Sequence, residues 1–502
     1  MRTPLAAVLC FVSLGVSAAP SLIIVNGKIF DVPAAQAIAI EGNKITAVGT
    51  NEQVRALADA STRVIDAAAR LVIPGINDAH THPGTVTPSF VATSDIEATA
   101  ANVSAAIAAA ADESAEDIWI RAEVGPAVVN DSTITRETLD RIAPKRKVMI
   151  TSFTGHGAVL STAALADLGI ALDSPDPLGG TFGRGADGKL NGRVSEYAQY
   201  AIDRRFASLA SAAELADGIN SFAQEAIGFG ITSVQAMPMV DEDAFAKAVQ
   251  RANTPLRIRQ ITFPTLAGQK PVFRSGGGLK WILDGTPIEH GAALRTAKYQ
   301  DGTQGRENFR DFLPLVKLAA DNNQQLLVHA AGDKAVATAL GAMKRVGNLK
   351  RPRIEHGDGL QSDLFEAARQ VGAVVVLNPT HFPFRGFYPA NQPYMLAASI
   401  KNAKIPIALG SDGPLNPYLN IMFAASRPDA PAEALTREEA LRAYTSGSAF
   451  AESMETQKGK IAPGMLADLA ILSQDILTVD AGALPDTRAD VTIINGKVVL
   501  ER

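Results

Sequence analysis

The chain has 502 residues, which is more than one ordinary hydrophobic core needs, so a large domain with a smaller companion is expected. Hydrophobic residues make up 47% of the chain and charged residues 20%, as is typical of a folded globular protein. The formal net charge is −5 and no cluster of Lys or Arg stands out, so nucleic acid and anionic membranes are excluded as expected partners.

Residues 1–19 have the pattern of a secretory signal peptide. Arg2 gives a short basic start, residues 5–16 form an apolar stretch, and small residues follow, so cleavage after Ala18 is predicted. The apolar stretch is shorter than the ~20 residues that a membrane anchor needs. We therefore expect an exported mature chain, periplasmic or secreted, without a membrane span.

Cys10 is the only cysteine, and it lies within this predicted signal peptide. The mature chain then has neither a disulfide nor a thiolate, which excludes a cysteine nucleophile and a cysteine-rich metal site. A lipoprotein signal is disfavoured, because Leu9 precedes Cys10 at a position that requires a small residue.

Short β-like runs at both ends of the mature chain predict one small β-sandwich domain. Turn signals separate these runs, which are Leu22–Val25, Ala37–Ile40, Lys44–Val48, Arg63–Asp66, Ala467–Leu472 and Asp490–Val499. Asn495 and Gly496 predict a hairpin turn within the last run. We expect residues 20–71 and 459–502 to form this domain together.

Between the two ends, apolar runs alternate with helical stretches, as in repeated βα units around a parallel sheet. The first strand ends near Ile76, and seven more are predicted at Gly230–Gln235, Leu256–Phe263, Gly278–Leu283, Gln325–Val328, Arg353–Glu355, Ala373–Leu377 and Pro406–Leu409. Eight such units predict an α/β fold of the TIM-type (β/α)8 barrel class over residues 72–458, with chemistry at the carboxyl ends of the strands. A large insertion after the first strand, at about 97–228, is predicted to cover or shape the pocket.

The run from Leu71 to Pro83 ends in a His-x-His pair. Side chains alternate along a strand, so His80 and His82 share a face and can converge on one point. Imidazole is a common ligand of zinc and similar metals, and two imidazoles supply half of a tetrahedral shell. A lone His-x-His pair fits a structural role equally well, so further ligands at strand ends must decide between the two.

Polar residues recur at three later strand ends, namely His329, His356 and Asp412. Each alone fits an ordinary hydrogen-bonded residue, but in this order with the His-x-His pair they predict a metal site. Lys280 lies in an apolar strand, where an unpaired ammonium is costly. Either carbon dioxide converts it to a carbamate, N6-carboxylysine, which can bridge two metals, or it pairs with an acid such as Asp284 on the same strand face.

Further motifs accompany these residues, including PGINDAHTH at 74–82, GH at 155–156, DPLGG at 176–180, GITSV at 230–234, VHA at 328–330, EH at 355–356, GSD at 410–412 and GKIAPGMLAD at 459–468. In this order they resemble the amidohydrolase superfamily of metal-dependent hydrolases. Within it the chain is most similar to the branch of N-substituted formamide deformylases and YtcJ-like hydrolases. The resemblance spans nearly the whole mature chain.

The resemblance implies a set of metal ligands on successive strands, consisting of His80, His82, Lys280, His329, His356 and Asp412. Lys280 would be the carbamylated ligand, and Asp412 would also carry the proton to the leaving nitrogen. One or two divalent ions, with zinc as the first choice, would lower the pKa of a bound water toward ~7 and polarise an amide-type carbonyl.

Six residues are predicted to contact the substrate, namely His156, Glu196, Asp284, His290, Asn378 and His381. His156 and Glu196 lie in the insertion and match family positions, with a structural hydrogen bond as their alternative role. His290 follows the fourth strand and His381 the seventh, where packing is the alternative. Glu355 is expected to face away from His356 and to act behind the ligands.

The sequence thus predicts an exported, metal-dependent amidohydrolase that cleaves a C–N bond in a small amide, formamide or N-acyl amine. A homo-oligomer is compatible with it. Three alternatives stay open: hydrolysis of an ester, urea or cyclic amide by the same ligands, a catalytically silent protein that binds a small solute, and a lyase or isomerase on the same scaffold.

Overall fold

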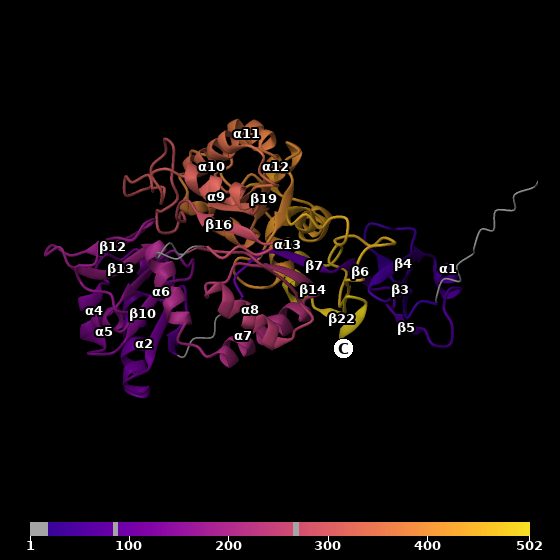
Figure 1. The fold of residues 1–502 in the computed structure, drawn as a ribbon, viewed down its shortest axis with the longest axis horizontal. Helices are drawn as coiled ribbons and strands as arrows, with labels where there is room; N and C mark the ends of the chain where they lie inside the picture. The colour runs from indigo at the N-terminus through magenta and orange to yellow at the C-terminus, as the bar shows by residue number, and fades with distance from the viewer. Residues whose placement is uncertain (1–18, 84–88, 265–270) are drawn as a thin grey trace, which may run out of the picture.

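The computed structural model describes residues 19–83, 89–264 and 271–502. The predicted signal peptide, except for Ala19, therefore lies outside the described residues. Three regions follow one another along the longest axis in Figure 1: sheets from the chain ends, a central region of parallel strands, and the insertion. No helix in the described part of the chain is both long enough and apolar enough to span a lipid bilayer.

The central region contains eight parallel strands in the predicted order, counted over the described residues. They are β7 (Ile76–Thr81), β14 (Ile231–Ala236), β15 (Arg257–Gln260), β16 (Gly278–Ile282), β17 (Gln325–Ala330), β18 (Arg353–His356), β19 (Val374–Leu377) and β20 (Ile407–Leu409). One sheet has the order β15-β14-β7, and the other runs from β16 to β20 in sequence order. Seven of the eight are buried throughout or nearly so, including β7 and β18, in which most residues are polar.

The two central sheets approach each other at both edges. Thr262 and Leu279 form a parallel bridge between the β15 and β16 sides, and the Asp412 N–H donates to the His80 carbonyl at 3.0 Å on the other side. The predicted α/β fold is confirmed. Closure into a (β/α)8 barrel stays a prediction, because the strands belong to two separate sheets.

Helices follow the central strands and cover their outer faces. Figure 1 shows several of them stacked above β16 and β19. They are α7 (Ala212–Gly228), α8 (Glu242–Ala252), α9 (Leu313–Asp321), α10 (Asp333–Val346), α11 (Phe365–Gln370), α12 (Ala397–Asn402), α13 (Pro417–Ala425), α14 (Arg437–Arg442) and α15 (Ser448–Ala451). The helix α8 illustrates why they form where they do, since the Asp241 side chain caps its start and Asn253 ends it in the left-handed conformation.

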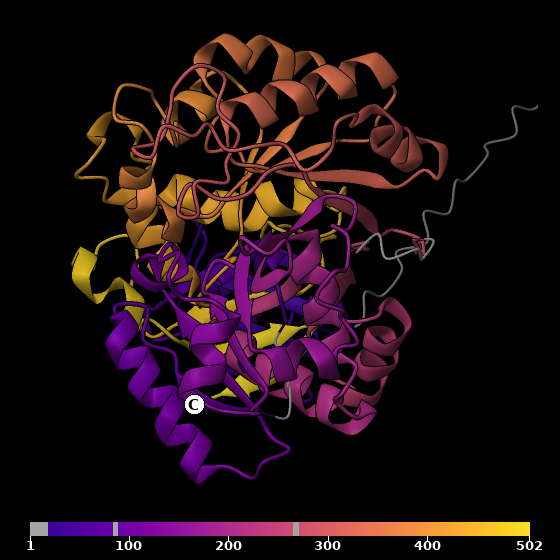
Figure 2. The same ribbon diagram turned by 90° about the vertical axis from the view of Figure 1, so that its left-hand side faces the viewer.

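The insertion forms a six-stranded sheet of its own, with the order β12-β13-β11-β10-β9-β8. Its strands are β8 (Ser89–Thr93), β9 (Trp119–Val124), β10 (Val148–Ser152), β11 (Gly157–Leu160), β12 (Gly180–Arg184) and β13 (Leu190–Glu196), with helices α2 (Ala100–Glu113), α3 (Pro126–Val129), α4 (Arg136–Ile142), α5 (Thr162–Asp167) and α6 (Tyr197–Ala207). This sheet begins at Ser89, before the predicted boundary near 97, because β8 pairs with β9. Figure 2 views the molecule from this side and shows the insertion in front of the central region.

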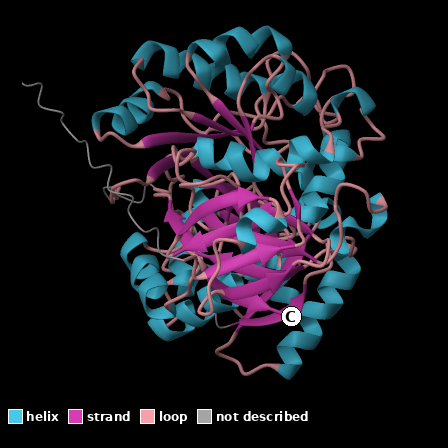
Figure 3. Cartoon of the chain, turned by 90° about the vertical axis from the view of Figure 1, so that its right-hand side faces the viewer, coloured by secondary structure: helices cyan, strands magenta, loops and turns pink. Residues whose placement is uncertain are grey.

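Two further sheets contain the chain ends. The first has the order β4-β3-β1-β5 and the second β2-β6-β21-β22-β23. Their elements are β1 (Leu22–Val25), β2 (Lys28–Ile29), β3 (Ala37–Glu41), β4 (Lys44–Gly49), α1 (Asn51–Arg55), β5 (Arg63–Asp66), β6 (Leu71–Pro74), β21 (Leu469–Leu472), β22 (Ala489–Ile494) and β23 (Lys497–Glu501). Figure 3 shows these strands facing the viewer.

One hydrophobic cluster joins the two terminal sheets. It contains Ile24 and Ile38 from the first sheet and Val72, Leu469 and Ile493 from the second. The two chain ends therefore share a core. The strand β6 belongs to this core although the sequence analysis assigned residues from 72 onward to the barrel, because β6 pairs antiparallel with β21.

Candidate metal centre and active site

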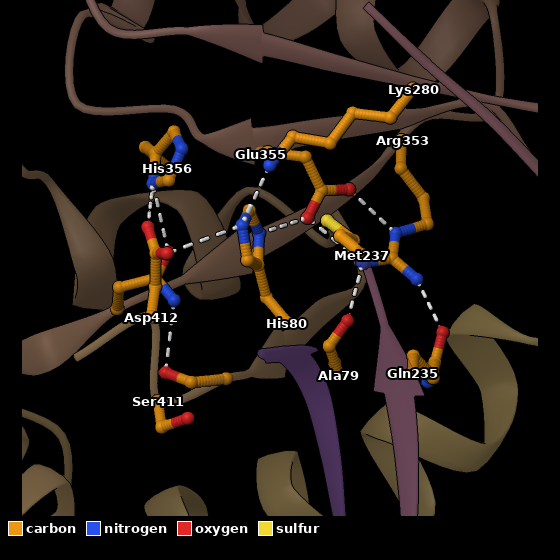
Figure 4. A network of polar contacts seen from close by, with 12 residues as sticks. Ala79, His80, Gln235, Met237, Lys280, Arg353, Glu355, His356, Ser411 and Asp412 are labelled. Carbon is orange, nitrogen blue, oxygen red and sulfur yellow. Dashed lines mark hydrogen bonds and ion pairs between the residues drawn. The ribbon is translucent and has the colours of Figure 1, made fainter. Parts of the chain in front are cut away.

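Four histidines and one aspartate converge at the carboxyl ends of the parallel strands, and Figure 4 shows His80 and His356 beside Asp412. The ring centroids of His80 and His82 are 5.4 Å apart, those of His80 and His356 5.0 Å, and those of His329 and His356 4.4 Å. One carboxylate oxygen of Asp412 lies 3.5 Å from His80 Nε2 and 3.3 Å from His82 Nε2. The other lies 3.6 Å from His356 Nδ1. Strand ends separated by more than 300 residues thus meet at one place.

Neighbouring acceptors fix the tautomers of the first two histidines. His80 Nδ1 lies 2.6 Å from Oε2 of Glu355, and His82 Nδ1 lies 2.7 Å from the Met237 carbonyl oxygen. An ionised carboxylate and a carbonyl can only accept, so each Nδ1 carries the hydrogen and each Nε2 presents a lone pair. Both lone pairs lie on the side of Asp412, which is the arrangement that metal-binding histidines need.

The Asn378 side chain orients His356 in the same way. Its Oδ1 lies 2.9 Å from His356 Nδ1, while its amide nitrogen donates to the Gly410 carbonyl at 2.9 Å. Nδ1 of His356 therefore carries the hydrogen, and Nε2 is left with a lone pair. His329 Nε2 is buried and has no hydrogen-bond partner among the described residues. A buried nitrogen without a partner is costly unless something else binds it.

The donor set fits a divalent metal. Two groups of three side chains have ligand atoms that all lie within 4.8 Å of one another: His80, His82 and Asp412, and His356, His381 and Asp412. Burial lowers the pKa of His80 to about 4 and lowers those of His329 and His356 well below the ordinary value. These imidazoles are therefore neutral at pH 7, the form that binds metal, and imidazole with carboxylate suits zinc and similar ions.

Glu355 and Arg353 support this centre from behind. Arg353 donates to both carboxylate oxygens of Glu355 at 2.7 and 2.8 Å, and it also contacts the Gln235 side chain and the Ala79 carbonyl. Figure 4 shows these contacts. Both charged side chains are fully buried. The expected role of Glu355 behind the ligands agrees with this geometry. Glu355 shares a strand face with Arg353, two residues earlier, as expected for a side chain that faces away from the neighbouring His356, and it reaches His80 Nδ1 from there.

Lys280 lies against the first histidine rather than against Asp284. Its Nζ is 2.9 Å from His80 Nε2, the side chain is buried, and burial lowers its pKa to about 8. No ion pair joins Lys280 to Asp284 in the described ranges. The Asp284 carboxylate instead accepts backbone N–H groups from Ala293, Ala331 and Gly332, which fixes the loop after His329. Carbamylation of Lys280 stays a prediction.

The insertion contributes a buried polar group next to His329. His156 Nδ1 lies 3.1 Å from Glu196 Oε1 and 2.9 Å from the Tyr200 hydroxyl, and the rings of His156 and His329 are 4.7 Å apart. Burial by itself would lower the pKa of His156, but the Glu196 carboxylate raises it above the ordinary value. Glu196 has φ 56° and ψ −131° at the junction of β13 and α6, a strained conformation that is concentrated at functional sites.

Two predicted substrate contacts lie in different surroundings. The His381 ring stacks on His356 at 5.4 Å, and its Nε2 is 3.7 Å from Asp412 Oδ2. His290 instead pairs with Asp301 at 2.7 Å and stacks on Tyr299. The backbone at His290 has φ 55°, which turns the side chain toward Asp301, so in the described structure His290 has no contact with the histidine cluster.

Sequence reasoning missed four contributors to the site. Tyr200 had a signal, because it follows Glu196 by four residues on a helix and such residues face each other. Asp78, which accepts the N–H groups of His80 and Ser411 at 3.0 Å, lies two residues before the first ligand. Arg353 could be noticed as a charge within an apolar strand. The Met237 carbonyl had no sequence signal, since any residue supplies one.

Comparisons with known proteins are consistent with this site. A family model described as "Amidohydrolase family" matches residues 63–500. The protein YtcJ of Bacillus subtilis (strain 168), whose name describes it as an amidohydrolase, is 28% identical over 422 residues, which cover 74% of this chain and 77% of that protein. The N-substituted formamide deformylase of Arthrobacter pascens is 24% identical over 555 residues, covering 96% and 98%.

A solved structure is also similar over almost the whole chain. It is that of an uncharacterized metal-dependent hydrolase from Pyrococcus horikoshii OT3, with a TM-score of 0.70 and 18% sequence identity. The similarity covers 92% of this chain and 99% of that chain. At this identity it shows a common fold.

Proposed function

We propose that this chain, which belongs to the amidohydrolase family, is a zinc-dependent hydrolase. Its substrate would be a small amide, formamide or N-acyl amine, in which it cleaves the C–N bond. The observation that carries this proposal is the convergence of four imidazoles and Asp412, with three imidazoles oriented by acceptors behind them. The deformylase relative adds formamides to the candidate substrates.

We also propose that the chain is exported, on the basis of the signal-like residues 1–19. Residues 1–18 lie outside the described structure, and the proposal rests on sequence alone. The measurement that checks it is the N-terminal sequence of the protein recovered from the periplasm or medium, which should begin at Ala19.

The Nε2 atoms of His80 and His82 would hold the metal together with Asp412, and His356 and His329 supply further imidazoles beside them. A bound divalent ion supplies a Lewis acid for the substrate carbonyl and makes a water molecule more acidic. The uncharged imidazoles leave the positive charge of the ion largely uncompensated, so its polarising effect is retained.

Asp412 is the group that moves the proton. Burial raises the pKa of this carboxyl, but the surrounding histidines lower it more, so its net pKa is well below the ordinary value and the carboxylate is ionised at pH 7. It can therefore accept a proton from the attacking water at one oxygen and deliver it to the leaving nitrogen. The backbone N–H of Asp412 is tied to the His80 carbonyl, which holds the carboxylate beside the ligands.

His156 is placed to contact the substrate from the side of the insertion. Glu196 and Tyr200 occupy its Nδ1 side, so Nε2 is the atom left for the substrate, and His156 has no Nε2 hydrogen bond among the described residues. The adjoining His329 ring brings this nitrogen next to the metal site.

The test measures metal content and turnover in the same preparations. We expect one or two equivalents of divalent metal per chain and hydrolysis of at least one member of a panel of amides, formamides and N-acyl amines. His80→Ala should lose metal, and Asp412→Ala should lower kcat by a factor of 10² or more, in the range for a lost proton-transfer group. Asp321→Ala, at an exposed aspartate at the end of α9, is the matched control.

Two outcomes would overturn the proposal. Full metal content without turnover on the amides, or on esters, ureas and cyclic amides, would indicate a binding protein. Turnover in oxygen-18 water without label in the product would indicate a lyase or isomerase instead of a hydrolase.

A further inference from the structure

Two aromatic side chains from distant parts of the chain meet beside the metal centre. Phe153 directly follows β10 of the insertion, and Phe384 lies in the 3₁₀ helix η2 (Pro379–Phe387) after β19. Their ring centroids are 5.4 Å apart with an interplanar angle of 48°. Both side chains are only half-buried, so part of each ring remains available to another molecule.

The helix η2 connects Phe384 to the centre. Residues three apart lie on the same face of a 3₁₀ helix, so Phe384 follows His381 along one face. His381 stacks on His356 and lies 3.7 Å from the Asp412 carboxylate. Phe384 is thus one helical turn farther out than the histidine that contacts the proton-transferring group.

Phe153 lies near His156 in the chain, and His156 adjoins the metal centre at His329. It lies three residues before His156, whose ring is 4.7 Å from that of His329. Four ring contacts join His156 to His329, His329 to His356, His356 to His381, and Phe384 to Phe153. The chain itself completes a closed circuit, because His381 and Phe384 are three residues apart, and so are Phe153 and His156.

The residues on either side of Phe153 are fixed. Ser152 donates to Glu289 Oε1 at 2.6 Å, and the Thr154 hydroxyl donates to the same oxygen.

Phe387, three residues after Phe384, extends the aromatic surface, and the ring centroids of these two residues are 6.3 Å apart. The rim of the circuit is therefore apolar and preorganised, which reduces the entropic cost of binding an apolar group.

We propose that Phe153 and Phe384 form the binding subsite for an apolar substituent on the scissile nitrogen. This inference rests on the proposed amide hydrolysis. Because Asp412 delivers the proton to the leaving nitrogen, that nitrogen lies on the Asp412 side of the centre, where His381 and then Phe384 follow. The substrate class is thus N-alkyl or N-arylalkyl amides, and the amine product carries the apolar group.

The first test compares two homologous substrate series on the metal-loaded enzyme. N-methyl-, N-propyl- and N-butylformamide vary the leaving amine, whereas N-methylformamide, N-methylacetamide and N-methylbutanamide vary the acyl group. Burial of each methylene in an apolar subsite is worth up to about fourfold in kcat/KM. We expect kcat/KM to rise roughly tenfold or more from N-methyl to N-butyl, with no comparable rise along the acyl series.

Two truncations locate the subsite. Phe153→Ala and Phe384→Ala should each reduce the N-butyl to N-methyl preference to about threefold or less, because kcat/KM for N-butylformamide should fall more than that for N-methylformamide. Phe365→Ala, at a half-buried phenylalanine of α11, is the matched control and should keep the preference. If an alanine variant does not fold, Phe153→Leu and Phe384→Leu retain apolar surface and should keep most of the preference, whereas Phe153→Ser and Phe384→Ser should lose it.

The outcomes separate this inference from the proposed function. If the metal-loaded enzyme hydrolyses no amide in either series, the proposed function fails. If it hydrolyses amides but shows no dependence on the N-alkyl chain, or if the two truncations lower kcat/KM equally for all substrates, the subsite inference is overturned while amide hydrolysis stands. Binding of butylamine measured by calorimetry gives a readout without turnover, and it should weaken in both truncations but not in Phe365→Ala.

Discussion

At the scale of single residues, Asn378 is the side chain that decides which nitrogen His356 offers to a metal. Replacing it with alanine removes the acceptor of the Nδ1 hydrogen, so the ring can exchange tautomers and rotate. We expect Asn378→Ala to weaken metal binding by a factor of about 10 to 100, the usual effect of losing such a partner. The metal affinity of the variant can be measured by competition with a chromogenic chelator at fixed pH.

The control for this variant is Asn402→Ala, at an exposed asparagine that ends α12. It should bind metal as the wild type does. Equal metal affinity in Asn378→Ala and in the wild type would mean that His356 does not depend on Asn378 for its orientation.

Glu355 makes the free energy of unfolding depend on pH in the acidic range. Burial raises the pKa of this carboxyl, but the charge of Arg353 and the contacts with His80 lower it to about 2, from an ordinary value of 4.5. A carboxyl with a depressed pKa in the folded state stabilises the protein at pH values above 4.5, and this contribution is lost as the pH falls toward 2. Glu355→Gln leaves Arg353 buried with an uncompensated charge, so we expect a loss of roughly 3–5 kcal/mol at pH 7.

This pH dependence is measured by urea unfolding of chelator-treated protein at pH 7 and pH 3. The difference in unfolding free energy between the wild type and Glu355→Gln should shrink at the lower pH. Glu366→Gln, at an exposed glutamate paired with Arg369, should cost less than about 1 kcal/mol at either pH. If the difference in unfolding free energy between the wild type and Glu355→Gln is the same at both pH values, the lowered pKa of Glu355 is contradicted.

The sequence predicts the residue types of the site better than their partners. His80, His82, His356 and Asp412 could be found because metal ligands come at strand ends, where their spacing is visible in the chain. Asp284 could not be placed, because three backbone N–H groups, one from its own loop and two from the loop after β17, decide where its carboxylate points. Such contacts depend on the tertiary fold and leave no local pattern.

At the scale of elements, Glu289 ties the insertion to the loop after β16. It accepts hydrogen bonds from Ser152 and Thr154 of the insertion and from Thr286 of its own loop. Glu289→Ala should release the segment that carries His156. We expect kcat/KM to fall about tenfold, mainly through a higher KM, because a substrate contact is displaced while the metal site is intact.

Hydrogen exchange of residues 152–157 checks this directly, since their amides should exchange faster in the variant. Glu116→Ala, at an exposed acid elsewhere in the insertion, should leave both exchange and KM unchanged. A change in kcat with an unchanged exchange rate would show that Glu289 acts on the reaction and not on the loop.

The sequence predicts the central strands well, because most contain or adjoin a short run of Val, Ile or Leu and helical stretches separate them along the chain. It predicts the insertion sheet poorly. β8 (Ser89–Thr93) is too short and too mixed in polarity to stand out, and it becomes a strand through its parallel pairing with β9. The start of the insertion was therefore placed too late.

At the scale of the whole molecule, the hydrophobic core is divided into several clusters. The largest includes Trp281 of the central region and extends to Tyr197 and Tyr200 in α6 of the insertion, whereas Trp119 belongs to another cluster, within the insertion. The chain ends share a third core, formed by pairings such as Leu469 with Pro74 that span almost 400 residues. Sequence patterns show which strands are apolar, but not that strands so far apart pair.

Because Trp281 and Trp119 lie in different clusters, we expect metal to stabilise their surroundings unequally, and the fluorescence of the two tryptophans reports this difference. Trp119→Phe leaves only the signal of Trp281 in β16, and Trp281→Phe leaves only that of Trp119 in β9. A metal that binds only the folded centre stabilises it by about 2.7 kcal/mol at a free concentration of 100 times Kd. In urea unfolding followed by fluorescence, metal should raise the midpoint reported by Trp281 and leave the Trp119 midpoint nearly unchanged. Equal shifts would mean that the contact between His156 and His329 makes the insertion and the central region unfold as one unit.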